Sequence, residues 1–158
     1  MRKTALVAVP LLLAAQSAFA DQVGGNGALA LAALVAENSP AVNAFNKLVM
    51  ARMLNGNLAF SYPAGQTIVV NADSVVCRAS NVDISAHSCQ LKFGGVTHSR
   101  VGRRAHEIYA TIAEIGVFPD GAAGSVFEAV SHLACTIDPN VVKQRVGGGA
   151  SCTFTPGP

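Results

Sequence analysis

Residues 75–93 read VVCRASNVDISAHSCQLKF, and this stretch decides the expected fold. Cys77 and Cys89 lie twelve positions apart, and apolar and polar residues alternate around each of them. Alternation with a period of two is typical of a strand with one buried face. The stretch therefore predicts a β-hairpin whose cysteines lie opposite each other on the buried face, as a cross-strand disulfide requires.

A second stretch of the same kind, residues 130–154, contains Cys135 and Cys152. From residue 126 onward a period of two places Ser131, Leu133 and Cys135 on one predicted face. We expect the disulfides Cys77–Cys89 and Cys135–Cys152, each closing one hairpin, although four cysteines also allow two crossed pairings. The spacings do not fit a zinc site, which needs cysteine pairs two to four residues apart.

Between the two hairpins the hydrophobic period changes to that of a helix. Apolar residues recur at spacings of 4, 3, 4 and 3, and charged residues occupy the opposite side of the predicted helix. The apolar positions are Val101, Ala105, Ile108, Ile112 and Ile115. We expect an amphipathic helix that packs against both hairpins.

The N-terminal part of the chain predicts two helices, over residues 28–37 and 40–54. In the second, an apolar stripe at three-to-four spacing is interpreted as core. That stripe consists of Val42, Phe45, Leu48, Val49 and Met53. The expected fold class is therefore α+β: N-terminal helices followed by an antiparallel sheet of two disulfide-closed β-hairpins flanking an amphipathic helix, a ββ-α-ββ unit.

Residues 1–20, MRKTALVAVPLLLAAQSAFA, have the three parts of a secretory signal peptide. Arg2 and Lys3 precede an apolar run, and a small-x-small cleavage site ends at Ala20. The run is shorter than the roughly 20 residues that a transmembrane helix needs. We expect export to the periplasm or the medium, with cleavage between Ala20 and Asp21. A flexible lead-in over residues 21–27 and one domain over residues 28–158 are then expected.

Loss of the signal peptide also changes the predicted charge. The whole chain has 11 Lys and Arg, and removal of Arg2 and Lys3 leaves 9, which balance 9 Asp and Glu. A protein of zero formal charge has no overall attraction to nucleic acid or to anionic lipid. We therefore expect neither as a partner, and no membrane span in the mature chain; an exported protein is the expected class of partner.

The densest polar cluster lies at the start of the central helix and contains Arg100, Arg103, Arg104 and His106. Helix-terminal NH groups together with guanidinium groups are able to bind a phosphate, sulfate or carboxylate. The alternative is a solvated helix end with ion pairs such as Arg103–Glu107, which lie four residues apart. The cluster is the candidate anion-binding site.

The histidines predict no metal site, and no cofactor is expected. None of His87, His98, His106 and His132 is spaced i, i+4 on a helix or i, i+2 on a strand. The chain also has no G-x-S-x-G, H-E-x-x-H or phosphate-binding glycine motif, and its four cysteines are assigned to disulfides. No catalytic residue is assigned, and a non-enzymatic protein is favoured.

These observations predict an exported, disulfide-stabilised binding module, for which an inhibitor of extracellular hydrolases is one form. This functional class rests on architecture alone. Two alternatives stay open: a small-anion-binding protein that uses residues 100–104, and a hydrolase with no recognisable motif.

Overall fold

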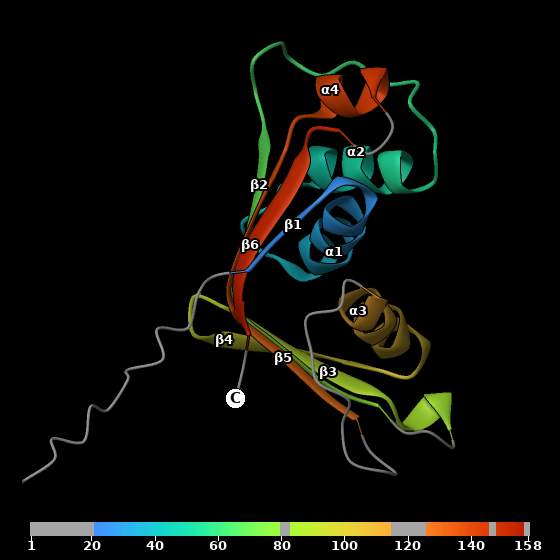
Figure 1. The fold of residues 1–158 in the computed structure, drawn as a ribbon, viewed down its shortest axis with the longest axis vertical. Helices are drawn as coiled ribbons and strands as arrows, with labels where there is room; N and C mark the ends of the chain where they lie inside the picture. Colours follow the sequence, from blue (N-terminus) through green and yellow to red (C-terminus); the bar gives the residue numbers. More distant parts are fainter. Residues whose placement is uncertain (1–20, 80–82, 115–125, 146–147, 157–158) are drawn as a thin grey trace, which may run out of the picture.

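The computed structural model describes residues 21–79, 83–114, 126–145 and 148–156, and this part of the chain has an α+β fold. Six strands form one antiparallel sheet in the order β1-β6-β5-β2-β3-β4, accompanied by four α-helices (Figure 1). The strands are β1 (Asp21–Gly24), β2 (Ile68–Ala79), β3 (Ser88–Phe93), β4 (Val96–Val101), β5 (Val126–Ile137) and β6 (Ala150–Pro156). The helices are α1 (Gly25–Asn38), α2 (Ala44–Leu54), α3 (Arg103–Glu114) and α4 (Pro139–Gln144), with a short 3-10 helix η1 (Ile84–Ala86).

The centre of the sheet is the pairing of β2 with β5. Each strand has 12 residues, and they pair from Ile68–Ile137 at one end to Ala79–Val126 at the other. On its outer side β2 pairs with β3, and β5 pairs with β6. The two hairpins therefore lie side by side, with the β2–β5 pair joining them.

Both predicted disulfides are confirmed. Cys77 and Cys89 are direct partners in the β2–β3 register with Cα atoms 4.1 Å apart, and Cys135 and Cys152 in the β5–β6 register are 4.0 Å apart. All four cysteines are buried. Cys89 Sγ lies 3.3 Å from the carbonyl oxygen of Ala105 in α3, so this disulfide lies directly beneath that helix.

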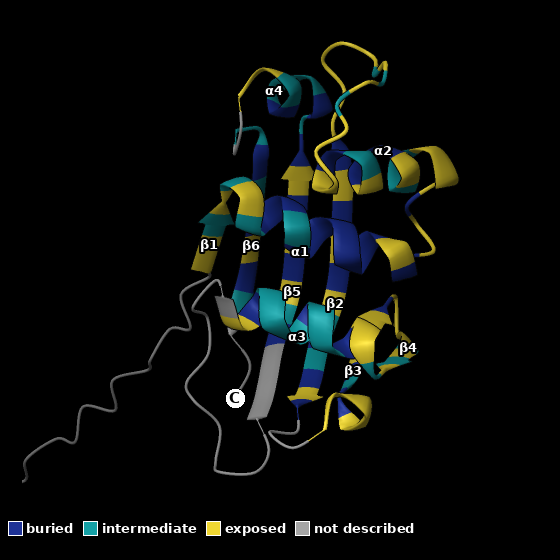
Figure 2. Cartoon of the chain, turned by 90° about the vertical axis from the view of Figure 1, so that its right-hand side faces the viewer, coloured by how far each residue is buried: buried dark blue, intermediate teal, exposed yellow. Residues whose placement is uncertain are grey.

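The helices α1 and α3 cover the same face of the sheet (Figure 2). Almost every residue of α1 from Ala28 onward is buried, because the sheet, α2 and α3 surround it. A helix that is apolar on all sides is stable only in such a position. The helix α2 packs beside α1, and α4 beside α2, toward the upper end of the sheet in Figure 1.

The two central strands bend at the same level of the sheet. His132 in β5 has a φ of 51°, and the β5–β6 register shifts between Ser131 and Ala134, which defines a β-bulge. As a result Val130 and Leu133 are both buried, which a strict period of two does not allow. The prediction that Ser131 shares the buried face with Leu133 is therefore wrong. In Figure 1 the strands change direction at this bend, with α1 above it and α3 below it.

An additional strand separates β3 from α3. Gly94 and Gly95 have φ values of 54° and 83°, and two consecutive positive φ values are characteristic of a type I′ hairpin turn. The turn leads into β4, the edge strand next to β3. Val101, predicted as the first residue of the helical stripe, ends β4 with a side chain that is 70% exposed. The rest of the stripe is buried in α3 except Ile115, which lies outside the described residues.

A strand also replaces the lead-in expected over residues 21–27. β1 pairs with β6, and α1 begins at Gly25 immediately after it. The pairing satisfies backbone groups that the outer edge of β6 otherwise exposes, which explains why a glycine-rich segment is ordered there. None of the described helices is long and apolar enough to cross a bilayer.

The double variant Cys135→Ala/Cys152→Ala should lose about 3 kcal/mol of unfolding free energy, because the disulfide closes a loop of this length in the unfolded chain. Alanine is chosen because both positions are buried. Urea unfolding followed by circular dichroism measures the change. The Cys77→Ala/Cys89→Ala variant should lose a similar amount, and a loss below about 1 kcal/mol in both contradicts the prediction.

Valine at position 132 should be destabilising even though valine favours strands and the position is exposed. His132→Val should reduce the unfolding free energy by about 1–2 kcal/mol, since a β-branched residue is strained at positive φ. His132→Gly should stay within about 1 kcal/mol of the native protein. The bulge is refuted if urea unfolding shows valine to be more stable than glycine.

Candidate functional site

The structure divides the predicted anion-binding residues among separate places. Arg103 and Arg104 lie in the first turn of α3 and line a shared cleft with Glu107. Arg100 lies on β4, where Nη1 donates a hydrogen bond to the carbonyl of Ser99 at 2.8 Å. The ring of His106 lies against the ring of His87. Two of the four predicted residues thus contribute to one cleft.

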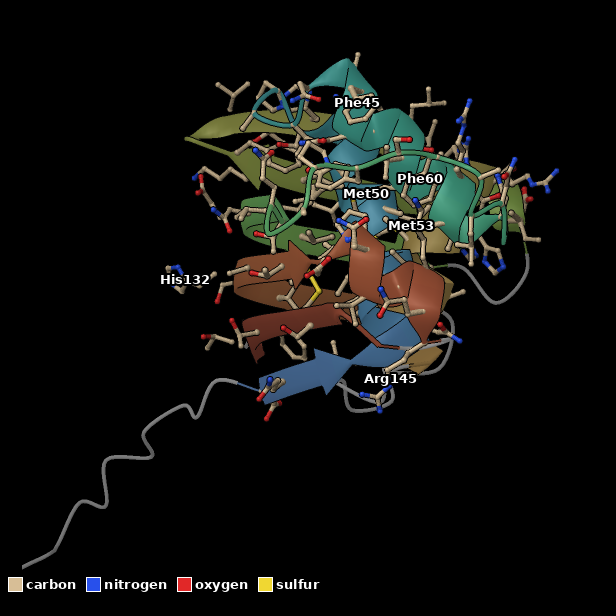
Figure 3. All side chains as sticks on the ribbon, turned by 90° about the horizontal axis from the view of Figure 1, so that it is seen from above. Phe45, Met50, Met53, Phe60, His132 and Arg145 are labelled. Carbon is tan, nitrogen blue, oxygen red and sulfur yellow. A yellow bond between two sulfur atoms is a disulfide. The ribbon has the colours of Figure 1, made fainter. Side chains whose placement is uncertain are left out.

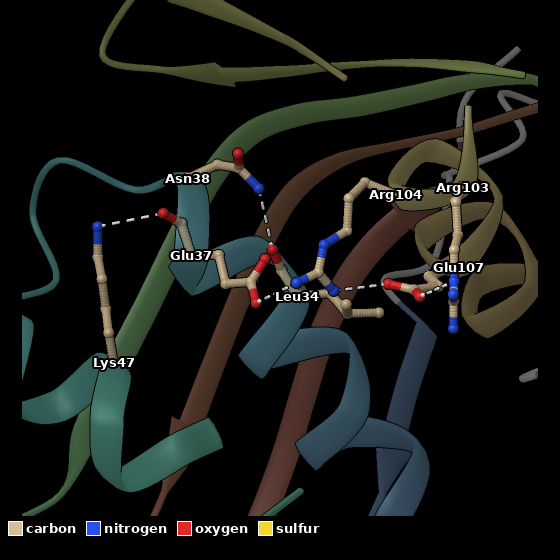
Figure 4. A network of polar contacts seen from close by, with 7 residues as sticks. All are labelled: Leu34, Glu37, Asn38, Lys47, Arg103, Arg104 and Glu107. Carbon is tan, nitrogen blue, oxygen red and sulfur yellow. Dashed lines mark hydrogen bonds and ion pairs between the residues drawn. The ribbon is translucent and has the colours of Figure 1, made fainter. Parts of the chain in front are cut away.

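The cleft has a volume of about 310 Å³ and contains both signs of charge. Glu107 accepts hydrogen bonds from both arginines: Arg104 Nη1 lies 2.7 Å from Oε2, and Arg103 Nε lies 3.3 Å from Oε1 (Figure 4). Spacings of three and four residues on α3 bring these side chains onto one face. The arginines are therefore already bound to a carboxylate of their own helix.

Arg104 also connects α3 to α1. Its Nη2 lies 3.7 Å from Oε1 of Glu37 near the end of α1. The backbone carbonyl of Glu37 accepts a hydrogen bond from Lys47 Nζ of α2 at 3.3 Å. Polar contacts thus connect the three helices at the surface (Figure 4).

The electrostatics of the cleft favour the charged forms of Glu107 and Arg104. The hydrogen bond from Arg104, followed by the charges of both arginines, lowers the pKa of Glu107 against the opposing effect of burial. The same hydrogen bond, together with the charge of Glu37, raises the pKa of Arg104. Glu107 inside the cleft, and Glu37 through Arg104, offset the positive charge of the two arginines and so weaken their attraction for an anion.

The helix α2 exposes two residues that the sequence assigned to the core. Val49, Met50 and Met53 are buried, whereas Phe45 is 51% exposed and Leu48 is 50% exposed. The prediction was wrong for Phe45 and Leu48 because α2 packs on α1 with only one of its sides. Phe45 and Leu48 lie outside this contact and stay about half exposed.

Aromatic stacking orders this side of α2. The rings of Phe45 and Tyr62 stack with centroids 5.9 Å apart and planes 7° from parallel. Burial, then the charge of Asp138, raises the pKa of Tyr62, so its hydroxyl stays protonated and donates to Asn46 Oδ1 at 3.2 Å. We call Phe45, Leu48 and Tyr62, with the neighbouring Lys47 and Arg52, the α2 surface. Figure 3 looks onto this end of the molecule.

Cations at this end bond to backbone carbonyls. Lys47 Nζ bonds to the carbonyl of Glu37, and Arg52 Nη1 bonds to that of Ala59 at 3.4 Å. Lys143 Nζ bonds to the carbonyl of Phe60 and lies 4.3 Å from the centre of the Phe60 ring. Within the described residues none of these three cations is in an ion pair with a carboxylate. In the described part of the chain these cations therefore contact backbone carbonyls and the Phe60 ring, and no carboxylate.

Neither the exposed side of α2 nor the contact between His87 and His106 was predicted from the sequence. The apolar stripe at 42, 45, 49 and 53 does not distinguish a helix whose stripe is fully buried from one whose stripe is partly exposed. The two histidines lie on different elements, so their spacing along the chain does not predict a contact. Among the described residues no group of three or more His, Cys, Asp or Glu side chains is placed to hold a metal ion.

Comparison of the chain with known protein families, with curated proteins and with solved structures finds no match. The function must therefore be inferred from the residues and their geometry.

The titration of Glu107 tests the structure of the cleft. In carbon-detected NMR its carboxyl group should titrate below the usual glutamate range, and Arg104→Gln should raise that pKa more than Arg103→Gln does. Because the folded-state pKa is lowered, the pair stabilises the protein above the unfolded-state pKa, and this stabilisation is lost as the pH falls through the folded-state value. If Arg103→Gln has the larger effect, the assigned pairing is wrong.

Proposed function

We propose that the protein is an exported, disulfide-stabilised binding module that docks on an acidic partner protein through the α2 surface. The observation that carries the proposal is an exposed apolar and aromatic patch beside cations that have no carboxylate partner in the described part of the chain. Export is supported by the signal-like pattern of residues 1–20 and by two disulfides, which persist in oxidising compartments.

The chemistry of the α2 surface supports a protein interface. Aromatic residues and arginine are enriched at interface centres and among the residues that dominate binding energy. Phe45 and Tyr62 are already stacked, so the aromatic pair loses little conformational freedom when a partner binds. The surface therefore offers a preorganised apolar contact.

The charge of the surface specifies the partner. Lys47 and Arg52 lie on the same helix as Phe45 and Leu48, and their charges are compensated only by backbone carbonyls. An acidic partner supplies the missing carboxylates and gains in association rate by electrostatic steering. An inhibitor of an extracellular hydrolase with an acidic surface is one partner type that fits this proposal.

In this proposal the two parts of the molecule have different roles. The antiparallel sheet with its two disulfides, together with α3, is the scaffold, and α2 presents the contact surface. Binding is favoured over catalysis because the sequence has no nucleophile motif and its cysteines form disulfides. A hydrolase without a recognisable motif is the less favoured alternative.

Small-anion binding at Arg103 and Arg104 is the second candidate, and it is supported by the cleft that these residues line. Arg103 is 89% exposed and accessible to a ligand. An incoming phosphate, however, must compete with Glu107 for both guanidinium groups. This competition is the reason to rank anion binding below docking through α2.

Serine substitutions test whether the α2 surface contributes more to partner binding than exposed apolar residues elsewhere. The variant Phe45→Ser/Leu48→Ser should bind its partner at least tenfold more weakly, since it loses the apolar centre of the interface. The matched control is Val69→Ser/Val96→Ser, which changes two residues of similar exposure (53% and 59%) on the sheet. A partner is captured from the secreted and periplasmic fractions, purified, and its affinity for each variant is measured by calorimetry at several salt concentrations.

The expected result is loss of affinity in the α2 variant alone, with affinity for the native protein falling as salt increases. Equal affinity of the native and α2-variant proteins contradicts the proposal. Binding to anionic lipid vesicles without any protein partner also contradicts it, because it assigns the surface to a membrane.

A further inference from the structure

His87 and His106 are 19 residues apart in sequence, yet their rings meet in the structure. The two Nδ1 atoms are 3.2 Å apart, and the ring centroids are 4.9 Å apart with planes at 62°. His87 directly precedes β3, and His106 is the fourth residue of α3. Expectations based on the spacing of histidines along one element missed this pair for that reason.

The backbone holds both histidines firmly. Gly102 donates its amide hydrogen to the carbonyl of His87 at 2.8 Å and accepts the amide of His106 at 2.9 Å. His87 is 5% exposed, and the edge of its ring contacts Tyr109 at a centroid distance of 5.8 Å. Gly102 thus holds the backbones of the two histidines next to each other, and His106 is partly exposed.

At 3.2 Å the two Nδ1 atoms are within hydrogen-bond distance of each other, and the same separation also fits two ligands of one metal ion. With metal–nitrogen bonds of about 2.0–2.1 Å and a tetrahedral angle, two ligand nitrogens lie roughly 3.3 Å apart. Imidazole is a preferred ligand of Zn²⁺ and Cu²⁺. The positions of the two Nδ1 atoms therefore fit a bound ion without a large movement of either ring.

We propose that His87 and His106 form a two-histidine site for a divalent d-block cation, with Cu²⁺ bound more tightly than Zn²⁺. The order of affinity follows the general stability order of these ions. Since the described residues provide no group of three ligands, water completes the coordination, and the site is open and exchangeable. This inference is independent of docking through the α2 surface.

Charges near the pair are consistent with a bound cation. Asp83, the N-cap of η1, has a pKa that is lowered by hydrogen bonds from Ser85 and, to a smaller extent, by the charge of His87. An ionised carboxylate near His87 favours added positive charge there. On α3 the nearest cations, Arg103 and Arg104, are bound to Glu107, which reduces their repulsion of an ion.

The test is metal titration of protein purified without a polyhistidine tag. Calorimetry with CuCl₂ and with ZnCl₂ should show saturable 1:1 binding to the native protein. His106→Ala, at the partly exposed position, should weaken both affinities at least tenfold, and so should His87→Gln. His132→Asn is the matched control, because asparagine tolerates the positive φ at that position, and it should bind like the native protein.

NMR identifies the ligands directly and does not depend on whether a variant folds. Substoichiometric Cu²⁺ should broaden the ring signals of His87 and His106 before those of His98 and His132. Circular dichroism and urea unfolding verify the fold of each variant. Absence of saturable binding, undiminished binding by folded His106→Ala, or broadening of all four histidines together overturns the proposal.

Discussion

The pairing of β2 with β5 is the constraint on which the rest of the structure depends. The two strands come from distant parts of the chain and pair over 12 residues each. Each forms a disulfide-closed hairpin with a neighbour in sequence, so this one long-range pairing joins two locally specified units into a single sheet. Long-range pairing incurs a loop-closure entropy cost, which the disulfides reduce within each hairpin but not between them.

This architecture explains which surfaces are available for function. The bend at His132 lets one face of the sheet accommodate α1 above and α3 below. The helix α2 packs beside α1 and α4, and its residues Phe45 and Leu48 stay about half exposed. Stacking of Phe45 on Tyr62 fixes the aromatic part of the α2 surface.

The local features were predictable from sequence, whereas the features that depend on tertiary contacts were not. The two disulfides, Cys77–Cys89 and Cys135–Cys152, were predicted because apolar and polar residues alternate around each cysteine and the members of each pair are a hairpin's length apart in sequence. The edge strands β1 and β4 were missed, since short strands with little apolar alternation carry a weak signal. The bulge breaks the period of two within β5, and the residue at its positive φ is a histidine, which does not mark a bulge in the sequence.

In the candidate sites, too, local contacts were predictable from sequence and tertiary contacts were not. Arg103 and Glu107 were paired correctly because helical spacing alone brings them together. The contribution of Glu37 to that network, the exposure of Phe45 and the meeting of His87 with His106 all depend on how separate elements pack. Such contacts have no signature in a single sequence.

Native-state hydrogen exchange tests the central role of the β2–β5 pair most directly. Amides in this pair, such as those of Val70, Val75 and Cys135, should exchange only through global unfolding, with free energies equal to that from urea denaturation. Amides of α2 and β4 should exchange through local opening at clearly lower free energies. If α2 or β4 exchanges as slowly as β2 and β5, or if β2 opens before its hairpin partner β3, the account is contradicted.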